Sequence, residues 1–155
     1  MFDHTKKWIS KNKFYYDEIH GIKYPTVSTI IDIHDFLVDA FRSEGEKIHK
    51  GILSDAVLSF SGIKYYMKGK DDKNEDIIIR AAHIFNLFLE EGHPFVDGNK
   101  RTGFVVTWLF LLLNGIELHL PSFHYKKHVE KINAWATLSS RDNISEITQW
   151  IKQNI

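Results

Sequence analysis

Apolar residues recur at helical spacing in three long segments of the chain. Between residues 25 and 41 they fall three and four positions apart, with His34 among the inward positions. Residues 75–91 repeat this period. Residues 99–114 are apolar on nearly every side, which is typical of a helix that other helices surround. The pattern therefore predicts two amphipathic helices and one central buried helix.

Three shorter segments carry helix signals. Residues 52–60 have the spacing of a short amphipathic helix, and Ser122 can cap another that continues to about residue 135. Asn143 and Glu146 are spaced as a capping pair for a last helix. With these segments the chain is predicted to be all-α.

One segment, residues 63–74, interrupts the helical period. It begins with the strand-prone Lys64, Tyr65 and Tyr66 and ends in a charged, turn-like stretch. We expect a small β-hairpin here that forms an exposed flap. The two tyrosines are either core aromatics or part of a flap that adds a strand from a target protein.

Composition narrows the class of protein. A chain of 155 residues with 43% hydrophobic residues suits one domain, residues 1–155, and residues 1 to about 22 are expected to be a basic, partly frayed N-terminal extension. The net charge is zero, which disfavours direct nucleic-acid or membrane binding. The chain has no cysteine, no signal peptide and no membrane-length apolar run, so we expect a cytoplasmic protein.

The candidate chemistry lies in one short stretch before the central helix, His93-Pro94-Phe95-Val96-Asp97-Gly98-Asn99-Lys100-Arg101-Thr102. His93 is the candidate general base, because imidazole titrates near neutral pH. Asp97 is the candidate Mg²⁺ ligand, because Mg²⁺ binds one or two carboxylates together with phosphate oxygens and water. Alone, the histidine would be an ordinary loop residue and the aspartate a turn residue. Together they indicate a phosphoryl-group site.

The following residues suit a bound nucleotide. Gly98 allows the backbone to approach a phosphate, and the N–H groups from Gly98 to Arg101 can form an anion-binding nest. Asn99 can cap the helix or contact a phosphate. Lys100 and Arg101 stand at the positive end of the helix dipole, where a cation is unfavourable unless an anion binds there. We therefore expect Gly98, Asn99, Lys100 and Arg101 to bind ATP or another nucleoside triphosphate.

The spacing His93-x-Phe95-x-Asp97-Gly98-Asn99-x-Arg101 resembles the signature of Fic-domain proteins (the Fic/Doc, or Fido, superfamily). Members usually transfer AMP from ATP to a protein hydroxyl. The resemblance implies that His93 is the base, that Asp97 holds Mg²⁺, and that Gly98, Asn99 and Arg101 bind phosphates.

Two positions differ from the AMP-transferring pattern. Lys100 stands where that pattern has glycine, and Phe104 where it has a second arginine. The run Asn99-Lys100-Arg101-Thr102 instead resembles the death-on-curing (Doc) branch, toxins of toxin–antitoxin pairs that phosphorylate a threonine of elongation factor Tu. The resemblance also places a target-docking flap at residues 63–70.

The resemblance implies a Doc-like protein kinase that transfers a phosphoryl group from ATP to a Ser or Thr hydroxyl of a protein target. A Fic-type adenylyltransferase (AMPylation) and a non-catalytic binding module on the Fic scaffold are the alternatives. The glutamates before Gly45 and Gly92 follow Ala40 and Leu87, where an inhibitory motif needs Ser or Thr. We therefore expect any restraint to come from a separate antitoxin. His124 and His128 are more readily explained as a solvated helix face than as metal ligands.

Overall fold

The computed structural model describes residues 2–89, 94–119, 130, 134 and 140–155. His93, most of the helix expected after Ser122, and the pair His124 and His128 lie outside these residues. In chain order the elements are α1 (Phe2–Lys11), β1 (Tyr16–Ile19), β2 (Ile22–Pro25), α2 (Val27–Ser43), the 3-10 helix η1 (Ala56–Ser59), the π-helix η2 (Gly62–Tyr66), α3 (Lys73–Leu89), α4 (Asn99–Leu113) and α6 (Ser140–Gln153).

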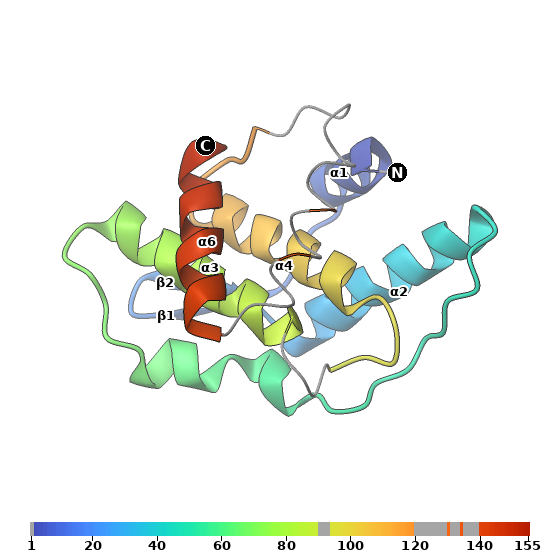
Figure 1. Ribbon diagram of the computed structural model, residues 1–155, viewed down its shortest axis with the longest axis horizontal. Coiled ribbons are helices and arrows are strands. Elements are labelled where there is room, and N and C mark those ends of the chain that lie inside the picture. The colour runs from blue at the N-terminus through green and yellow to red at the C-terminus, as the bar shows by residue number, and fades with distance from the viewer. Residues whose placement is uncertain (1, 90–93, 120–129, 131–133, 135–139) are drawn as a thin grey trace.

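The predominantly helical fold confirms the all-α prediction. Helices α2, α3 and α4 lie close to the bounds predicted from the apolar periodicity. Helix α4 occupies the centre, with α2 and α3 packed against it, while α6 packs on α3 (Figure 1). Every residue of α4 from Thr102 to Leu111 is buried, as expected for a helix that is apolar on all sides.

Helices α3 and α4 approach closely at Gly103. A Cβ atom at this position would lie 2.5 Å from the Cβ of Phe88, so no larger residue fits without moving the helices. Gly103 therefore fixes the spacing between the two helices that flank the candidate loop.

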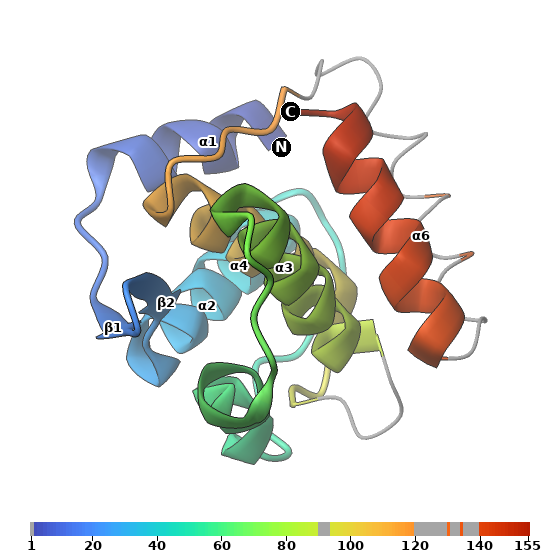
Figure 2. The ribbon, with the colours of Figure 1, turned by 90° about the vertical axis from the view of Figure 1, so that its left-hand side faces the viewer.

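The N-terminal residues form a helix and a β-hairpin. Helix α1 contacts α2 through Trp8, whose ring stacks on that of Phe36 at 4.1 Å. Figure 2 shows α1 joined by a short connection to the hairpin of β1 and β2. Strands β1 and β2 form an antiparallel hairpin across His20 and Gly21, both at positive φ (51° and 77°). Two such residues fit a type I′ turn. The small hairpin of the fold therefore lies at residues 16–25.

The prediction of a hairpin at residues 63–74 is wrong, because residues 62–66 form η2, α3 begins at Lys73 and the residues between them form no strand. Buried Arg80 explains the compact conformation. Its Nη1 donates to the carbonyl of Ile63 (2.5 Å) and its Nη2 to that of Met67 (3.3 Å). These carbonyls accept hydrogen bonds from a side chain instead of from the backbone of a neighbouring strand.

The acidic partner of Arg80 completes this connection. Asp76 accepts from Arg80 Nε at 3.0 Å and, through its other oxygen, from the backbone N–H of Lys70 at 3.1 Å. Arg80 Nη1 also donates to the hydroxyl of buried Tyr24, and burial raises the pKa of this tyrosine. The network ties residues 63–70 to α3 and to the hairpin.

Two further helix predictions need correction. In residues 52–60 only η1 is helical, and Ile52 forms a β-bridge with Phe95. Asn143 does not cap α6, because that helix begins earlier, at Ser140. Its amide instead donates to Asn86 of α3 at 3.2 Å, so it links the two helices. No helix in the described parts of the chain has the length and apolar character needed to cross a membrane.

Candidate active site

The loop between α3 and α4 is closed by its own asparagine. Asn99 is buried; its Oδ1 accepts from the N–H of Phe95 at 2.9 Å, and its Nδ2 donates to the Phe95 carbonyl at 2.8 Å. Phe95 is fully buried and anchors the loop. Gly98 is the N-cap residue of α4 at φ 78°. Asn99 therefore shapes the loop, and its side chain does not cap the helix.

An extended segment, residues 46–54, borders the loop. Val96 donates to the carbonyl of Gly51 at 3.0 Å, and Leu53 donates to that of Pro94 at 2.8 Å, on either side of the bridge formed by Ile52. The N–H of His49 donates to Asp97 Oδ2 at 2.9 Å. The segment thus fixes the loop backbone and orients the Asp97 carboxylate.

Helix α2 supports the loop from the interior. Nε2 of His34 lies 2.7 Å from the carbonyl oxygen of Asp97. The imidazole stacks on the ring of Phe95 at 3.8 Å with an interplanar angle of 5°. A buried polar side chain thus contacts the loop backbone at the residue directly before Gly98.

Arg101 extends from the first turn of α4 to an acidic partner. Its two terminal nitrogens donate to the two carboxylate oxygens of Glu46 at 2.5 and 3.0 Å, and its guanidinium lies 3.6 Å from the ring centroid of Phe41. The hydrogen bonds from Arg101 hold the pKa of the Glu46 carboxyl below its ordinary value. The arginine is therefore fixed at the loop and balanced by a carboxylate.

The N-terminus of α4 has the features of an anion site. No side chain caps it and no acidic residue lies in its first turn, while Lys100 and Arg101 both lie there. The first N–H groups of a helix lack intrahelical partners and carry partial positive charge. A phosphate at this position could accept hydrogen bonds from N–H groups of this turn and would place negative charge beside the two cations.

The family comparison identifies the family of the domain that carries this loop. The family model of the Fic/DOC family matches residues 24–111, from within β2 to the last turn of α4. The chain belongs to the Fic/DOC family. Comparison with curated proteins and with solved structures gave no match. The matched region contains α2, segment 46–54, α3, the loop and most of α4, and hence the whole described site of this Fic-domain protein.

The structure brings together five of the predicted site residues. Asp97, Gly98, Asn99, Lys100 and Arg101 follow one another through the loop into the first turn of α4. His93, the predicted base, lies outside the described residues. It directly precedes Pro94, whose carbonyl accepts hydrogen bonds from segment 46–54. The candidate site therefore combines a loop, a helix N-terminus and the bordering segment 46–54.

The three residues predicted to form the docking flap have different environments. Lys64 is buried, and its Nζ lies 3.4 Å from Asp17 Oδ2 of the hairpin. Tyr65 and Tyr66 are exposed by 60% and 84%. Only the two tyrosines can offer substantial surface to a partner, because the lysine is committed to the fold.

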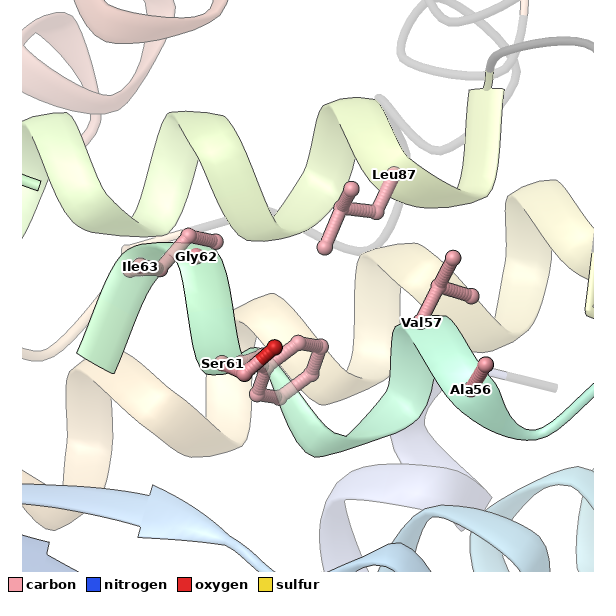
Figure 3. Close-up of a pocket in the computed structure, with 7 residues that line it drawn as sticks. Ala56, Val57, Ser61, Gly62, Ile63 and Leu87 are labelled. Carbon is pink, nitrogen blue, oxygen red and sulfur yellow. The ribbon is translucent and has the colours of Figure 1, made fainter. Parts of the chain in front are cut away.

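A pocket of about 250 Å³ lies beside η1 and η2, covered by Leu87 of α3 (Figure 3). Its lining is mostly apolar, with Ser61 as its one hydroxyl side chain, and contains no charged residue. A triphosphate requires cations and N–H donors, so this pocket does not suit a nucleotide.

Three residues that build the site are not apparent from the sequence: His34, Glu46 and His49. The apolar periodicity places His34 on the inward face of α2, and its ring does lie in the core. Glu46 and His49 stand in a segment that has no motif of its own. The only signal in the sequence is a single histidine on an otherwise apolar helical face.

Proposed function

We propose that this Fic/DOC protein is a Doc-like kinase that transfers the γ-phosphoryl group of ATP to a Ser or Thr hydroxyl of a protein. The environment of Phe104 carries the choice of kinase over adenylyltransferase. Phe104 is buried and contacts the rings of Phe85 and Trp150 edge to face at 6.0 and 5.9 Å. A second phosphate-binding arginine is thus replaced by a core residue, and the triphosphate is left with a different set of cations.

The residues present fit a magnesium ion. Asp97 supplies one carboxylate, which the N–H of His49 orients. A single carboxylate suits Mg²⁺, which is commonly held by one or two carboxylates together with phosphates and water. When bound, the ion would neutralise charge on the phosphate oxygens.

The chemical step uses groups of this chain around one phosphorus atom. His93 accepts the proton of the target hydroxyl as its oxygen bonds to the γ-phosphorus. The bond between the γ-phosphorus and the bridging oxygen breaks, and ADP leaves. The N–H groups at the start of α4, Lys100 and Arg101 stabilise the charge on the transferring oxygens. Arg101 must exchange its contact with Glu46 for one with phosphate.

Elongation factor Tu is the first target to test, on the basis of the Doc resemblance. Tyr65 and Tyr66 are exposed on η2 and are the proposed contacts for the target. The proposal places the reaction in the cytoplasm, where ATP and the translation machinery are available. A separate antitoxin is the proposed restraint.

ATP labelled at either the α- or the γ-phosphate tests the proposal. Purified protein is incubated with elongation factor Tu, and separately with a cell lysate, and protein-bound label is measured. Transfer of γ-label alone supports the kinase. Transfer of α-label would establish an adenylyltransferase instead, and absence of both labels would favour a binding module. A His93→Ala preparation controls for contaminating kinases.

A further inference from the structure

His34 is a buried donor to the backbone of the loop. It is 1% exposed, and its Nε2 lies 2.7 Å from the carbonyl oxygen of Asp97. Because a carbonyl oxygen only accepts hydrogen bonds, Nε2 must carry the proton and donate it. Nδ1, on the opposite side of the ring, lies 3.8 Å from Asp35 Oδ1. The role of the ring is therefore to donate a hydrogen bond from Nε2 to the loop backbone.

Packing holds this donor in one place. One face of the imidazole stacks on Phe95, which is itself fully buried. A Cβ atom at Gly98 would lie 3.6 Å from Nε2 of His34 and 3.4 Å from Cδ1 of Ile48, so the backbone at Gly98 lies against the ring. The position of Nε2 is thus set by contacts, and Nε2 in turn fixes where the carbonyl of Asp97 lies.

The position of this carbonyl determines the direction of the next N–H. In a trans peptide the C=O and N–H bonds point in opposite directions, and the described chain contains no cis peptide. Since the Asp97 carbonyl points at His34, the N–H of Gly98 points away from the core. Among the residues described, none accepts a hydrogen bond from this N–H. It is available to an anion at the start of α4.

We propose that His34 is a positioning residue for the phosphate site, which it serves by fixing the orientation of the Asp97–Gly98 peptide. Without the donor, the peptide can rotate and present its carbonyl oxygen where the N–H had been. A carbonyl oxygen repels phosphate, whereas a preoriented N–H binds it without reorganisation. The role of His34 rests on the proposed nucleotide site and adds an interior residue to it.

Three variants of His34 separate donation from packing. His34→Phe keeps an aromatic ring against Phe95 without a donor, and His34→Met is a second variant without a donor should the first fold poorly. His34→Gln restores an N–H near the position of Nε2. Thr29→Val is the matched control, because Thr29 is a buried residue of the same helix that donates to the carbonyl of Tyr15 at 3.0 Å, outside the loop.

ATP affinity in the presence of Mg²⁺ is measured by calorimetry, and thermal unfolding is followed in parallel. We expect the Phe and Met variants to bind ATP about tenfold more weakly, the Gln variant to remain within about threefold of wild type, and the control to bind normally. The inference is overturned if the Phe variant binds as wild type does, or if glutamine gives no recovery.

The backbone amide of Gly98 gives a readout that does not require nucleotide binding. In the nuclear magnetic resonance spectrum of the free protein, its signal should shift in His34→Phe and stay in place in Thr29→Val. If wild type binds no ATP while this signal behaves as expected, the proposed function fails and the orienting contact stands. If the signal does not change in His34→Phe, the contact fails whatever the protein binds.

Discussion

Buried polar side chains hold both the loop at residues 94–98 and the segment at residues 62–70. The loop presents a backbone N–H group, whereas the segment presents two aromatic side chains. In the loop, His34, Asn99 and segment 46–54 bind the backbone on several sides, and Phe95 is buried. In the second segment Arg80 fixes the backbone while Tyr65 and Tyr66 extend into solvent. The comparison suggests a preorganised site for phosphate chemistry and a separate, less constrained surface for recognition.

Replacing the proposed base should give the largest effect on chemistry. His93→Ala is expected to lower phosphoryl transfer by about 10²- to 10⁴-fold, because proton removal from the hydroxyl is lost. ATP affinity should hardly change, since this group acts mainly in the transition state. Transfer rate and ATP affinity are measured side by side.

His119→Ala is the control, because His119 is an exposed histidine that follows α4. Full activity in His93→Ala would remove the base assignment.

Replacing Arg80 should have the largest effect on stability. Arg80→Met leaves Asp76 buried without its cation and frees the carbonyls of Ile63 and Met67, so the free energy of unfolding should fall by about 3 kcal/mol. Chemical denaturation measures the change. Lys73→Met removes a positive charge from the exposed start of the same helix and should have little effect. Equal losses in the two variants would mean that the buried network is not the cause.

Removing an exposed aromatic should affect recognition alone. Tyr66→Ala is expected to lower kcat/KM for the protein target by about tenfold, a typical loss for an aromatic interface residue, and to leave ATP affinity and stability unchanged. Tyr15→Ala is the matched control, because this tyrosine is 76% exposed and precedes the hairpin. Equal target kinetics in wild type and Tyr66→Ala would place docking elsewhere.

Freeing Arg101 should give the smallest effect. Arg101 and Glu46 are 37% and 44% exposed, and exposed pairs contribute little, so Glu46→Gln should tighten ATP binding by about threefold at most. The change follows from removing a carboxylate that competes with phosphate. Titration of ATP into the variant measures it, with Glu44→Gln as a control of equal charge. Weaker binding in Glu46→Gln would mean that Glu46 holds Arg101 ready for the ligand.

The same pair predicts a dependence of stability on pH. The hydrogen bonds from Arg101 lower the pKa of Glu46 in the folded state. The ionised Glu46 carboxylate therefore stabilises the fold above the ordinary pKa of 4.5, and this stabilisation is lost as the pH falls through the lowered pKa. The wild-type melting temperature should therefore fall more steeply in acid than that of Glu46→Gln. Parallel acid profiles of the two proteins would contradict the pairing.

The sequence predicted what depends on local pattern. The three long helices follow from apolar periodicity, and the phosphate loop follows from the clustering of chemically distinct residues between two of them. The hairpin was misplaced because residues 64–67 favour strand locally, whereas Arg80, Asp76 and Tyr24 impose a compact turn from other elements. Such a tertiary contact leaves no local periodicity.

The hairpin carried a sequence signal that went unused, whereas the pairing of segment 46–54 with the loop carried none. The His20-Gly21 pair between residues 16–19 and 22–25 is a two-residue loop whose glycine favours the turn of the hairpin. Segment 46–54 pairs with the loop across about forty residues of chain, and no spacing within it indicates that pairing. The motif therefore revealed the chemical groups, while the residues that orient them required the structure.

The most direct test of the kinase proposal is a crystal structure of His93→Ala with ATP and Mg²⁺. Because the variant lacks the base, it should not transfer the phosphoryl group, and intact ATP should remain bound. The proposal predicts the triphosphate against Gly98, Lys100 and Arg101 at the start of α4, with Mg²⁺ at Asp97 and the γ-phosphorus nearest residue 93. An α-phosphorus at that position, or a nucleotide bound away from the loop, would contradict it.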